Sequence, residues 1–210
     1  MLTLQDARPW YPQDDEVHGF GHIERVYRLC QRIGEAEGAD MEILLTAALL
    51  HDAQGSHPGE NSRDDHHLRS AAFAGEVLSG MGWDKGHIEA VQHCIRAHRY
   101  RKEDLPQTLE AKILFDADKL DVLGAVGVVR ALAYAFQVGT PAYANPSQHF
   151  LTHWETVEGE PHSAYHEYLF KLKNIASRLL TPAAKEIAKE RQSFLNRFFE
   201  QLADEMREDE

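Results

Sequence analysis

The sequence predicts an all-α protein, and three observations support this fold class. Apolar residues recur at helical spacing along most of the chain, as in Ile23, Val26, Cys30 and Ile33. No run of alternating apolar and polar residues is long enough to indicate a strand. The 210 residues are 43% hydrophobic and include only 8 Pro and 14 Gly, which is typical of a packed core. We therefore expect one globular helical domain over residues 1–210.

Start and stop signals divide the first part of the chain into elements. A first helix is expected over residues 21–37, ending near Gly38, because glycine commonly terminates helices. A second helix is expected to run from Asp40, as its N-cap, to Asp52. The segment 53–65 is dense in Gly, Pro, Ser and Asp and is expected to form a loop.

The middle of the chain predicts three more helical stretches. One covers residues 67–79, and another covers residues 84–98. Pro106 opens a longer stretch whose second half, residues 122–136, is apolar on nearly every side. This is expected of a helix buried in the middle of a bundle. Residues 138–161 show no clear period and predict a long loop, a feature that is often a lid or a binding loop.

The two ends of the chain are expected to form C-terminal helices and an N-terminal extension. Two final helices are expected over residues 163–180 and 182–206, packed on the bundle. The first 20 residues form an N-terminal extension that lacks a basic segment followed by an apolar stretch. No apolar run approaches the roughly 18 residues that a membrane span requires. We therefore expect a cytoplasmic protein with no membrane partner.

Charge and cysteine content narrow the classes of partner. The formal net charge of -12 argues against a polynucleotide substrate or an anionic lipid surface, since such binding depends on Lys and Arg neutralising phosphates. A small phosphate compound stays possible if a bound cation helps to hold it. The two cysteines, Cys30 and Cys94, lack a CxxC spacing and predict buried thiols, not a disulfide or a zinc knuckle.

The dipeptide His51-Asp52 closes the apolar run EILLTAALL and indicates a metal site. A carboxylate at the edge of a buried helix is costly unless it is paired or bound to a cation. The same reasoning applies to Asp118 within DADKLD. With His22, these residues offer four donors from three helical elements, and histidine with carboxylate suits divalent transition metals. Taken singly, each has an ordinary alternative: a satisfied core histidine, or an aspartate that caps a helix.

The order of His22, His51-Asp52 and Asp118 resembles the HD superfamily of metal-dependent phosphohydrolases. Further stretches look like a small one-domain bacterial subfamily and cover most of the chain after residue 20: ALLHDA, HHLRSAAFAGEVL, AVQHCIRAHRY, LFDADKLDVLGAVGVVRA and YLFKLKNIASRLLTPAAKEIAKERQSFL. The resemblance implies an HD-domain helical bundle in which these four residues hold one divalent ion (Mn, Co, Ni, Fe, Mg or Zn). It also implies hydrolysis of a small nucleotide-type phosphate compound, and some members of the subfamily are nucleoside triphosphate pyrophosphohydrolases.

Other residues near these motifs are expected to serve catalysis and substrate binding. Asp52 and Asp121 are the candidate catalytic residues, and Asp121 would act as a general base or orient a ligating histidine. The alternative for Asp121 is a structural ion pair with Lys119 or Arg25. For phosphate binding we expect Lys119, His66 and His98. For His66 and His98, an exposed histidine at a loop or a helix end stays an open alternative.

Several alternatives remain at the level of sequence. Some HD enzymes bind two metals through further histidines, and His66, His93 and His98 lie where such ligands would be sought. The basic run HRYRK at 98–102 could contact phosphate or only stabilise a helix C-terminus, and Lys171 and Lys173 could line a solvated helix face. The chain could also be a nucleotide-sensing regulatory module with little or no turnover, or a scaffold for oxidative iron chemistry.

Overall fold

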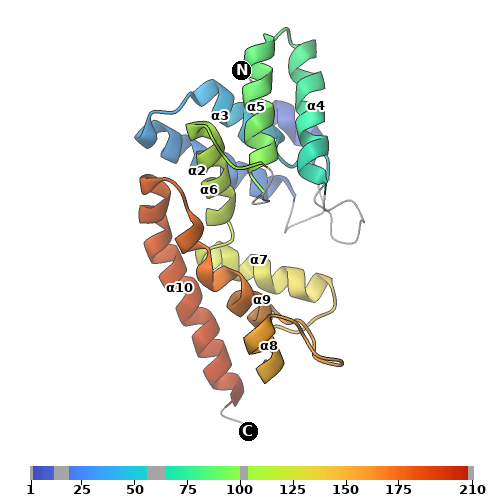
Figure 1. Ribbon diagram of the computed structural model, residues 1–210, viewed down its shortest axis with the longest axis vertical. Helices are drawn as coiled ribbons and strands as arrows, with labels where there is room; N and C mark the ends of the chain where they lie inside the picture. Colours follow the sequence, from blue (N-terminus) through green and yellow to red (C-terminus); the bar gives the residue numbers. More distant parts are fainter. Residues whose placement is uncertain (1, 12–18, 56–64, 100–103, 208–210) are drawn as a thin grey trace. The chain divides into compact units, whose positions relative to one another are not determined.

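The computed structural model describes residues 2–11, 19–55, 65–99 and 104–207, and these ranges contain helices and no strand (Figure 1). The predicted all-α class is confirmed. The chain divides into two compact units. The first comprises Met1–Lys119 with Leu179–Ala184, and the second comprises Leu120–Arg178 with Lys185–Glu210.

Helices α2 (Phe20–Glu37) and α3 (Met41–Leu50) pack against each other in the first unit, and their boundaries follow the predicted signals. Gly38 has a φ of 76°, a left-handed conformation that glycine adopts without a Cβ clash, and it ends α2 as predicted. The side chain of Asp40 accepts hydrogen bonds from the first backbone amides of α3 and caps it as predicted. Helix α3 ends two residues before the expected Asp52, because a turn begins at His51.

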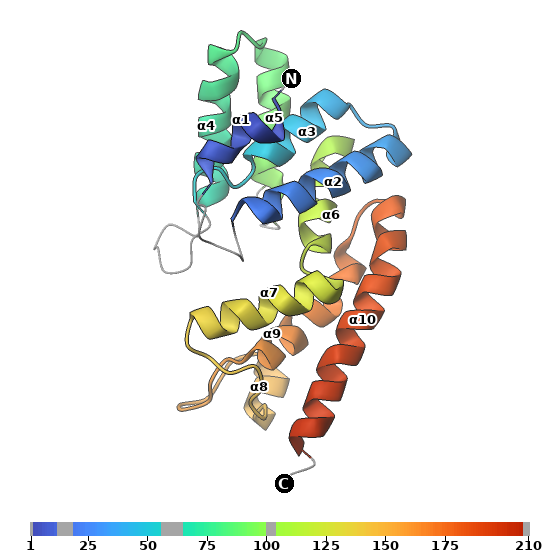
Figure 2. The same ribbon diagram turned by 180° about the vertical axis from the view of Figure 1, so that it is seen from behind.

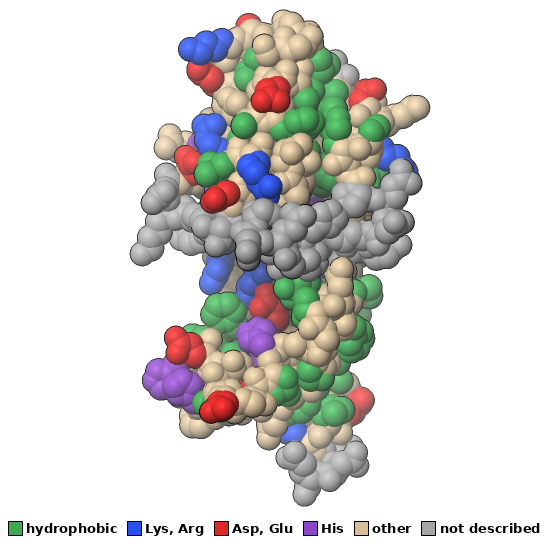
Figure 3. Space-filling view, turned by 90° about the vertical axis from the view of Figure 1, so that its right-hand side faces the viewer, with side chains coloured by type: hydrophobic (Ala, Val, Ile, Leu, Met, Phe, Trp, Pro, Cys, Tyr) green, Lys and Arg blue, Asp and Glu red, His purple; other side chains and the backbone are tan. Residues whose placement is uncertain are grey.

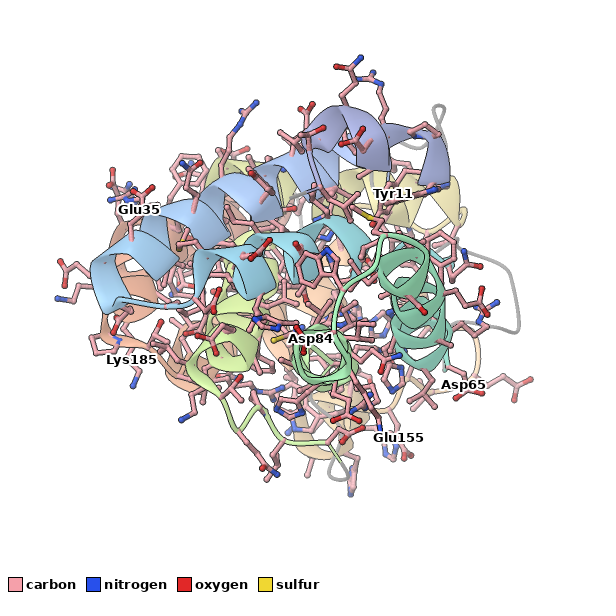
Figure 4. All side chains as sticks on the ribbon, turned by 90° about the horizontal axis from the view of Figure 1, so that it is seen from above. Tyr11, Glu35, Asp65, Asp84, Glu155 and Lys185 are labelled. Carbon is pink, nitrogen blue, oxygen red and sulfur yellow. The ribbon has the colours of Figure 1, made fainter. Side chains whose placement is uncertain are left out.

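Helices α4 (His66–Gly80) and α5 (Lys85–Ala97) lie side by side and antiparallel, as Figures 1 and 2 show. Asp84, labelled in Figure 4, caps α5 through two backbone amides. Helix α3 also packs on α5, and the interior between the helices is lined by fully buried apolar side chains. Most of the loop predicted over residues 53–65 lies outside the described residues.

Helix α6 (Leu109–Leu120) carries most of the motif DADKLD, of which Asp116–Lys119 belong to the first unit. The Thr108 hydroxyl accepts a hydrogen bond from the Ala111 amide at the start of this helix. Asp116 is fully buried, and its carboxylate accepts hydrogen bonds from the backbone amides of Leu180 and Thr181 at 2.8 and 2.7 Å. This carboxylate therefore attaches the short segment Leu179–Ala184 to α6.

The long helical stretch expected after Pro106 is interrupted, so that part of the prediction is wrong. Residues 121–123 form a turn, and α7 (Gly124–Gln137) begins with a φ of 70° at Gly124. The turn approaches the new helix closely: a Cβ at Gly127 would lie 2.2 Å from the carbonyl oxygen of Val122. Among the described helices, none alone is long and apolar enough to span a membrane, and α6 and α7 reach that length only as a bent pair.

The expectation that residues 122–136 form a helix buried in the middle of a bundle is also wrong. One side packs into an apolar cluster of the second unit with Tyr168 from α9 and with Phe199 from α10. Val129 and Phe136 on the other side are 66% and 63% exposed. Within this unit, α9 (Ala164–Phe170) and α10 (Pro182–Arg207) cover only part of the surface of α7. The local sequence of α7 does not indicate which part is covered.

Residues 138–161 are less irregular than predicted, because they contain α8 (Gln148–His153), which Ser147 caps. The Glu160 carboxylate accepts hydrogen bonds from the Ser147 and Val157 amides at 2.6 and 2.9 Å and closes the segment on itself.

Exposed histidines gather at the surface of the second unit on the face shown in Figure 3.

The C-terminal prediction is partly wrong. The helix expected over residues 163–180 is confined to α9, which is followed by the 3-10 turns Leu172–Asn174 and Ala176–Arg178. The final helix, expected over residues 182–206, is confirmed as α10.

Candidate metal centre

His51 and Asp52 stand in the turn that follows α3. The His51 ring is fully buried, and its Nδ1 lies 2.8 Å from the carbonyl oxygen of Ala48. Because a carbonyl can only accept, Nδ1 carries the proton of the neutral ring and Nε2 presents a lone pair. Metal-binding histidines are commonly oriented by such a hydrogen bond.

The Nε2 atom of His51 faces two residues from other helices. It lies 3.3 Å from Nε2 of His22, which stands in the first turn of α2. The same His22 atom lies 3.5 Å from Oδ1 of Asp118 on α6. One ligand atom from each of these three residues lies within 4.8 Å of the others. Three separate helical elements therefore place two imidazoles and a carboxylate around a common point.

Asp52 faces two sets of histidines. Its Oδ2 lies 3.8 Å from Nε2 of His51 and 3.9 Å from Nε2 of His22. Its Oδ1 lies 3.3 Å from Nε2 of His66 and 3.5 Å from Nε2 of His98. Asp52, His66 and His98 form a second group of three whose ligand atoms lie within 4.8 Å.

The spacing and chemistry of these atoms fit a divalent cation. Donors about 2.1 Å from one ion lie about 3.0 Å apart in octahedral geometry and about 3.4 Å apart in tetrahedral geometry. The distances from 3.3 to 3.9 Å around His22 and His51 are close to these values. Oδ1 of Asp52 is buried and, among the described residues, has no hydrogen bond of good geometry. A cation near this carboxylate would offset the cost of its burial.

His66 and His98 differ in the ring nitrogen that carries the proton. Nδ1 of His98 lies 2.6 Å from the Ile95 carbonyl oxygen, so the neutral ring turns a lone pair at Nε2 toward Asp52. Nδ1 of His66 lies 3.2 Å from the Arg99 guanidinium, which can only donate. This contact favours the neutral tautomer of His66 that carries its proton on Nε2, on the side that faces Asp52.

Electrostatics keep His51, Asp52 and Asp118 in the protonation states that a metal requires. Burial disfavours the charged imidazolium of His51 and lowers its pKa to about 4, although the nearby Asp52 works in the opposite direction. Burial would raise the pKa of Asp118, but Lys119 and the surrounding histidines outweigh it and hold this pKa well below its usual range. The pKa of Asp52 is likewise lowered against burial, chiefly through His51.

Lys119 stands directly beside a predicted ligand. Its Nζ donates to Oδ2 of Asp118 at 2.6 Å, lies 3.4 Å from the His98 carbonyl oxygen, and sits over the Phe115 ring. Oδ1 of Asp118 faces His22, so the two oxygens of this carboxylate have separate neighbours. The ammonium group can therefore orient the carboxylate as well as contact a phosphate.

Asp121 belongs to the second unit, where its buried carboxylate pairs with Arg130 at 2.6 Å. The sequence had pointed to Lys119 or Arg25 and had not indicated Arg130 as a partner.

Other basic and histidine candidates also have identifiable neighbours. His93 accepts a hydrogen bond from the Gln107 amide and belongs to neither group of three. In the second unit, Lys171 pairs with Glu167, and Lys173 lies over the Tyr168 ring. The part of HRYRK from 100 to 102 lies outside the described residues.

One neighbour of the site was missed at the level of sequence. Tyr11 is buried, and its hydroxyl donates at 2.8 Å to the carbonyl oxygen of Leu49, two residues before His51. No periodicity or motif in the N-terminal segment marked this residue. The short stretch RPWYPQ that contains it has no helical or strand period and carries no signal of a contact 38 positions away.

Comparison with known proteins agrees with this geometry. The HD domain family matches residues 19–123. The chain is 31% identical to the uncharacterized protein YpgQ of Bacillus subtilis (strain 168), over 96% of this chain and 93% of YpgQ. The crystal structure of Bacillus subtilis YpgQ in complex with ADP has a TM-score of 0.74 to this chain at 30% identity, covering 98% of both chains.

A second solved structure is similar over nearly the whole chain. It is a predicted HD superfamily hydrolase from an uncultured Thermotogales bacterium, 27% identical, with a TM-score of 0.65 and coverage of 97% of this chain and 90% of that one. The family match begins just before the helix that carries His22 and extends past Asp118. The chain therefore belongs to the HD domain family and is an HD-superfamily hydrolase of the metal-dependent phosphohydrolase class.

Proposed function

We propose that this protein hydrolyses a small nucleotide-type phosphate compound with one divalent metal ion, and that its leading activity is release of pyrophosphate from nucleoside triphosphates. The observation that carries the proposal is the convergence of imidazole and carboxylate ligand atoms from α2, the α3 turn and α6. Further support is that the relative YpgQ was crystallised with ADP.

The proposed ligands are His22, His51, Asp52 and Asp118, which can present nitrogen lone pairs and ionised oxygens toward one another. When bound, the ion supplies Lewis-acid chemistry: it makes water a better nucleophile and offsets negative charge on the phosphoryl group. Mixed nitrogen and oxygen ligation suits Mn, Co, Ni, Fe or Zn, and Mg is the further candidate.

The tautomer that Arg99 favours for His66 supports a site with a single ion. With Arg99 donating to its Nδ1, His66 turns a proton toward Asp52 and the space beside it. That proton can be donated to a phosphate oxygen. Lys119 and His98 are the other proposed phosphate contacts, and His98 would donate to phosphate only as an imidazolium, because Ile95 takes the proton of its neutral ring. A second ion beside Asp52 would require His66 to break its contact with Arg99 or to change its tautomer.

Asp52 is the first proposed catalytic residue, and Asp121 is the second candidate. One oxygen of Asp52 can face the ion while the other accepts a hydrogen bond from the attacking water, which orients it toward phosphorus. For Asp121, the ion pair with Arg130 favours a role in holding structure over proton transfer, because a carboxylate bound to a guanidinium is a weak base. Asp121→Asn therefore distinguishes the two roles. Loss of a catalytic base would lower kcat, whereas loss of a structural ion pair would lower the stability of the protein.

The test uses purified protein with manganese, cobalt, nickel or magnesium and a panel of nucleoside mono-, di- and triphosphates, and it separates orthophosphate from pyrophosphate. Pyrophosphate from triphosphates supports the proposal, and orthophosphate from monophosphates would identify a nucleotidase instead. Asp52→Ala should abolish turnover and retain helical content. The control Asp204→Ala, an exposed carboxylate on α10, should retain activity. Nucleotide binding without any turnover would instead support the regulatory module.

A further inference from the structure

The N-terminal segment of residues 2–11 is an ordered part of the first unit. Thr3 and Asp6 form a capping box that starts α1 (Leu4–Ala7), and the turn Arg8–Trp10 continues it. Helix α1 packs on α3, and the Trp10 ring meets Phe73 of α4 edge to face with centroids 5.4 Å apart. The HD family match begins only at residue 19, so this segment is an addition to the matched region.

Tyr11, labelled in Figure 4, belongs to this segment and is buried within the unit. Tyr11 is only 5% exposed, and its ring centroid lies 5.7 Å from that of Phe20, at the start of α2. Its hydroxyl donates to the Leu49 carbonyl oxygen at 2.8 Å. This contact connects the added segment to the last turn of α3.

The last carbonyl groups of α3 need partners from outside the helix, as at any helix end. The Ala53 amide bonds to the Leu50 carbonyl three residues back, so it does not continue the α-helical pattern to Leu49. The two preceding carbonyl groups accept hydrogen bonds from side chains. His51 Nδ1 donates to the Ala48 carbonyl oxygen, and the Tyr11 hydroxyl donates to the Leu49 carbonyl oxygen.

The Tyr11 hydroxyl keeps its proton for the Leu49 carbonyl oxygen. Burial raises the pKa of Tyr11 well above its usual value, and the Asp52 carboxylate adds to this effect. The hydroxyl donates to the Leu49 carbonyl oxygen, two residues before His51 and three before Asp52. This hydrogen bond therefore holds the end of α3 from which the His51-Asp52 turn departs.

We infer that Tyr11 is a positioning residue that holds the His51-Asp52 turn in the conformation required for metal binding. The inference rests on the proposed metal-binding function but assigns a role to a residue outside the matched family region. Without the hydroxyl, the Leu49 carbonyl loses the hydrogen bond that Tyr11 donates to it. The turn could then rotate, and both ligands would move with it. Outer-shell partners of this kind typically contribute about 10–100-fold to metal affinity.

The test is Tyr11→Phe, which removes the hydroxyl and keeps the buried ring. We expect the dissociation constant for Mn²⁺ or Co²⁺, measured by calorimetry on metal-free protein, to rise about 10-fold or more. The Tm should fall by only about 2–4 °C, as for one lost hydrogen bond in a chain of this size. Because Tyr11 would act through the metal ligands, excess metal should restore kcat with little change in KM.

The matched control is Tyr168→Phe, which also removes a buried tyrosine hydroxyl, here one that contacts Glu200 at 3.5 Å in the second unit. It should lower Tm without changing metal affinity. Equal metal affinity in wild type and Tyr11→Phe would overturn the inference.

A wild-type protein that binds metal but hydrolyses no phosphate compound would contradict the proposed function and leave the Tyr11 test valid. If the wild type bound no metal, NMR of the His51 ring would test whether Tyr11 positions the turn. An altered tautomer or exchange rate in Tyr11→Phe would support positioning of the turn, and an unchanged ring would overturn it.

Discussion

Replacing Asp116 with Asn should destabilise the protein while leaving its metal affinity intact. In the wild type, Oδ1 of Asp116 accepts from the Leu180 amide, and Oδ2 accepts from the amide and hydroxyl of Thr181, at distances from 2.7 to 2.8 Å. Asn has one carbonyl oxygen. If that oxygen faces Thr181, its amino group faces the Leu180 amide, and two donors oppose each other.

The magnitude follows from these contacts. An unsatisfied buried amide costs about 1–3 kcal/mol, and each of the two remaining hydrogen bonds loses about 1 kcal/mol when the charge is removed. The free energy of unfolding should therefore fall by about 4 kcal/mol. In a chain of this size, each kcal/mol shifts Tm by about 2–4 °C, so we expect a decrease of about 8–16 °C.

The assay compares Asp116→Asn with Asp118→Asn by thermal unfolding of metal-free protein and by metal titration. Asp118 is two residues away on the same helix, but its Oδ1 faces His22 instead of a backbone amide. Asp118→Asn should lose metal affinity and keep most of its Tm. The reasoning is refuted if Asp116→Asn loses less than about 1 kcal/mol, or if it loses metal affinity as severely as Asp118→Asn.

Three further predictions test other parts of the structure. Lys119→Ala should raise the KM for a nucleoside triphosphate about tenfold and change metal affinity less, because a charge-assisted hydrogen bond to phosphate is lost; the reverse order of effects would assign Lys119 to the support of Asp118. Backbone hydrogen bonds from Ser147 and Val157 lower the pKa of Glu160 to about 2, so its ionised form stabilises the fold above its unfolded pKa near 4.5, and this contribution is lost as pH falls toward 2. The Tm difference between wild type and Glu160→Gln should accordingly shrink over that range, and a constant difference would contradict the assignment. Gly127→Ala would place a Cβ against the Val122 carbonyl, and urea unfolding should show a loss of about 1–3 kcal/mol; an unchanged midpoint would mean that the turn relaxes freely.

The helix boundaries that were predicted well depend on local chemistry. Gly38 ends α2, and Asp40 and Asp84 cap α3 and α5, because each acts on backbone groups within a few residues of itself. The predictions that failed depend on distant neighbours. The exposure of Val129 and Phe136 reflects which helices cover α7, and apolar composition alone cannot report that coverage.

The sequence by itself determined the all-α class, most helix ends and the kinds of donor in the motifs around His51 and Asp118. Only the tertiary structure decided that the carboxylate of Asp116 bonds to backbone amides and that the carboxylate of Asp118 faces an imidazole. Asp116 finds its partners 64 and 65 residues later, and Tyr11 finds its partner 38 residues later. Helical periodicity arises from contacts three or four residues apart, whereas the environment of a buried polar group is created by segments that meet only when the chain folds.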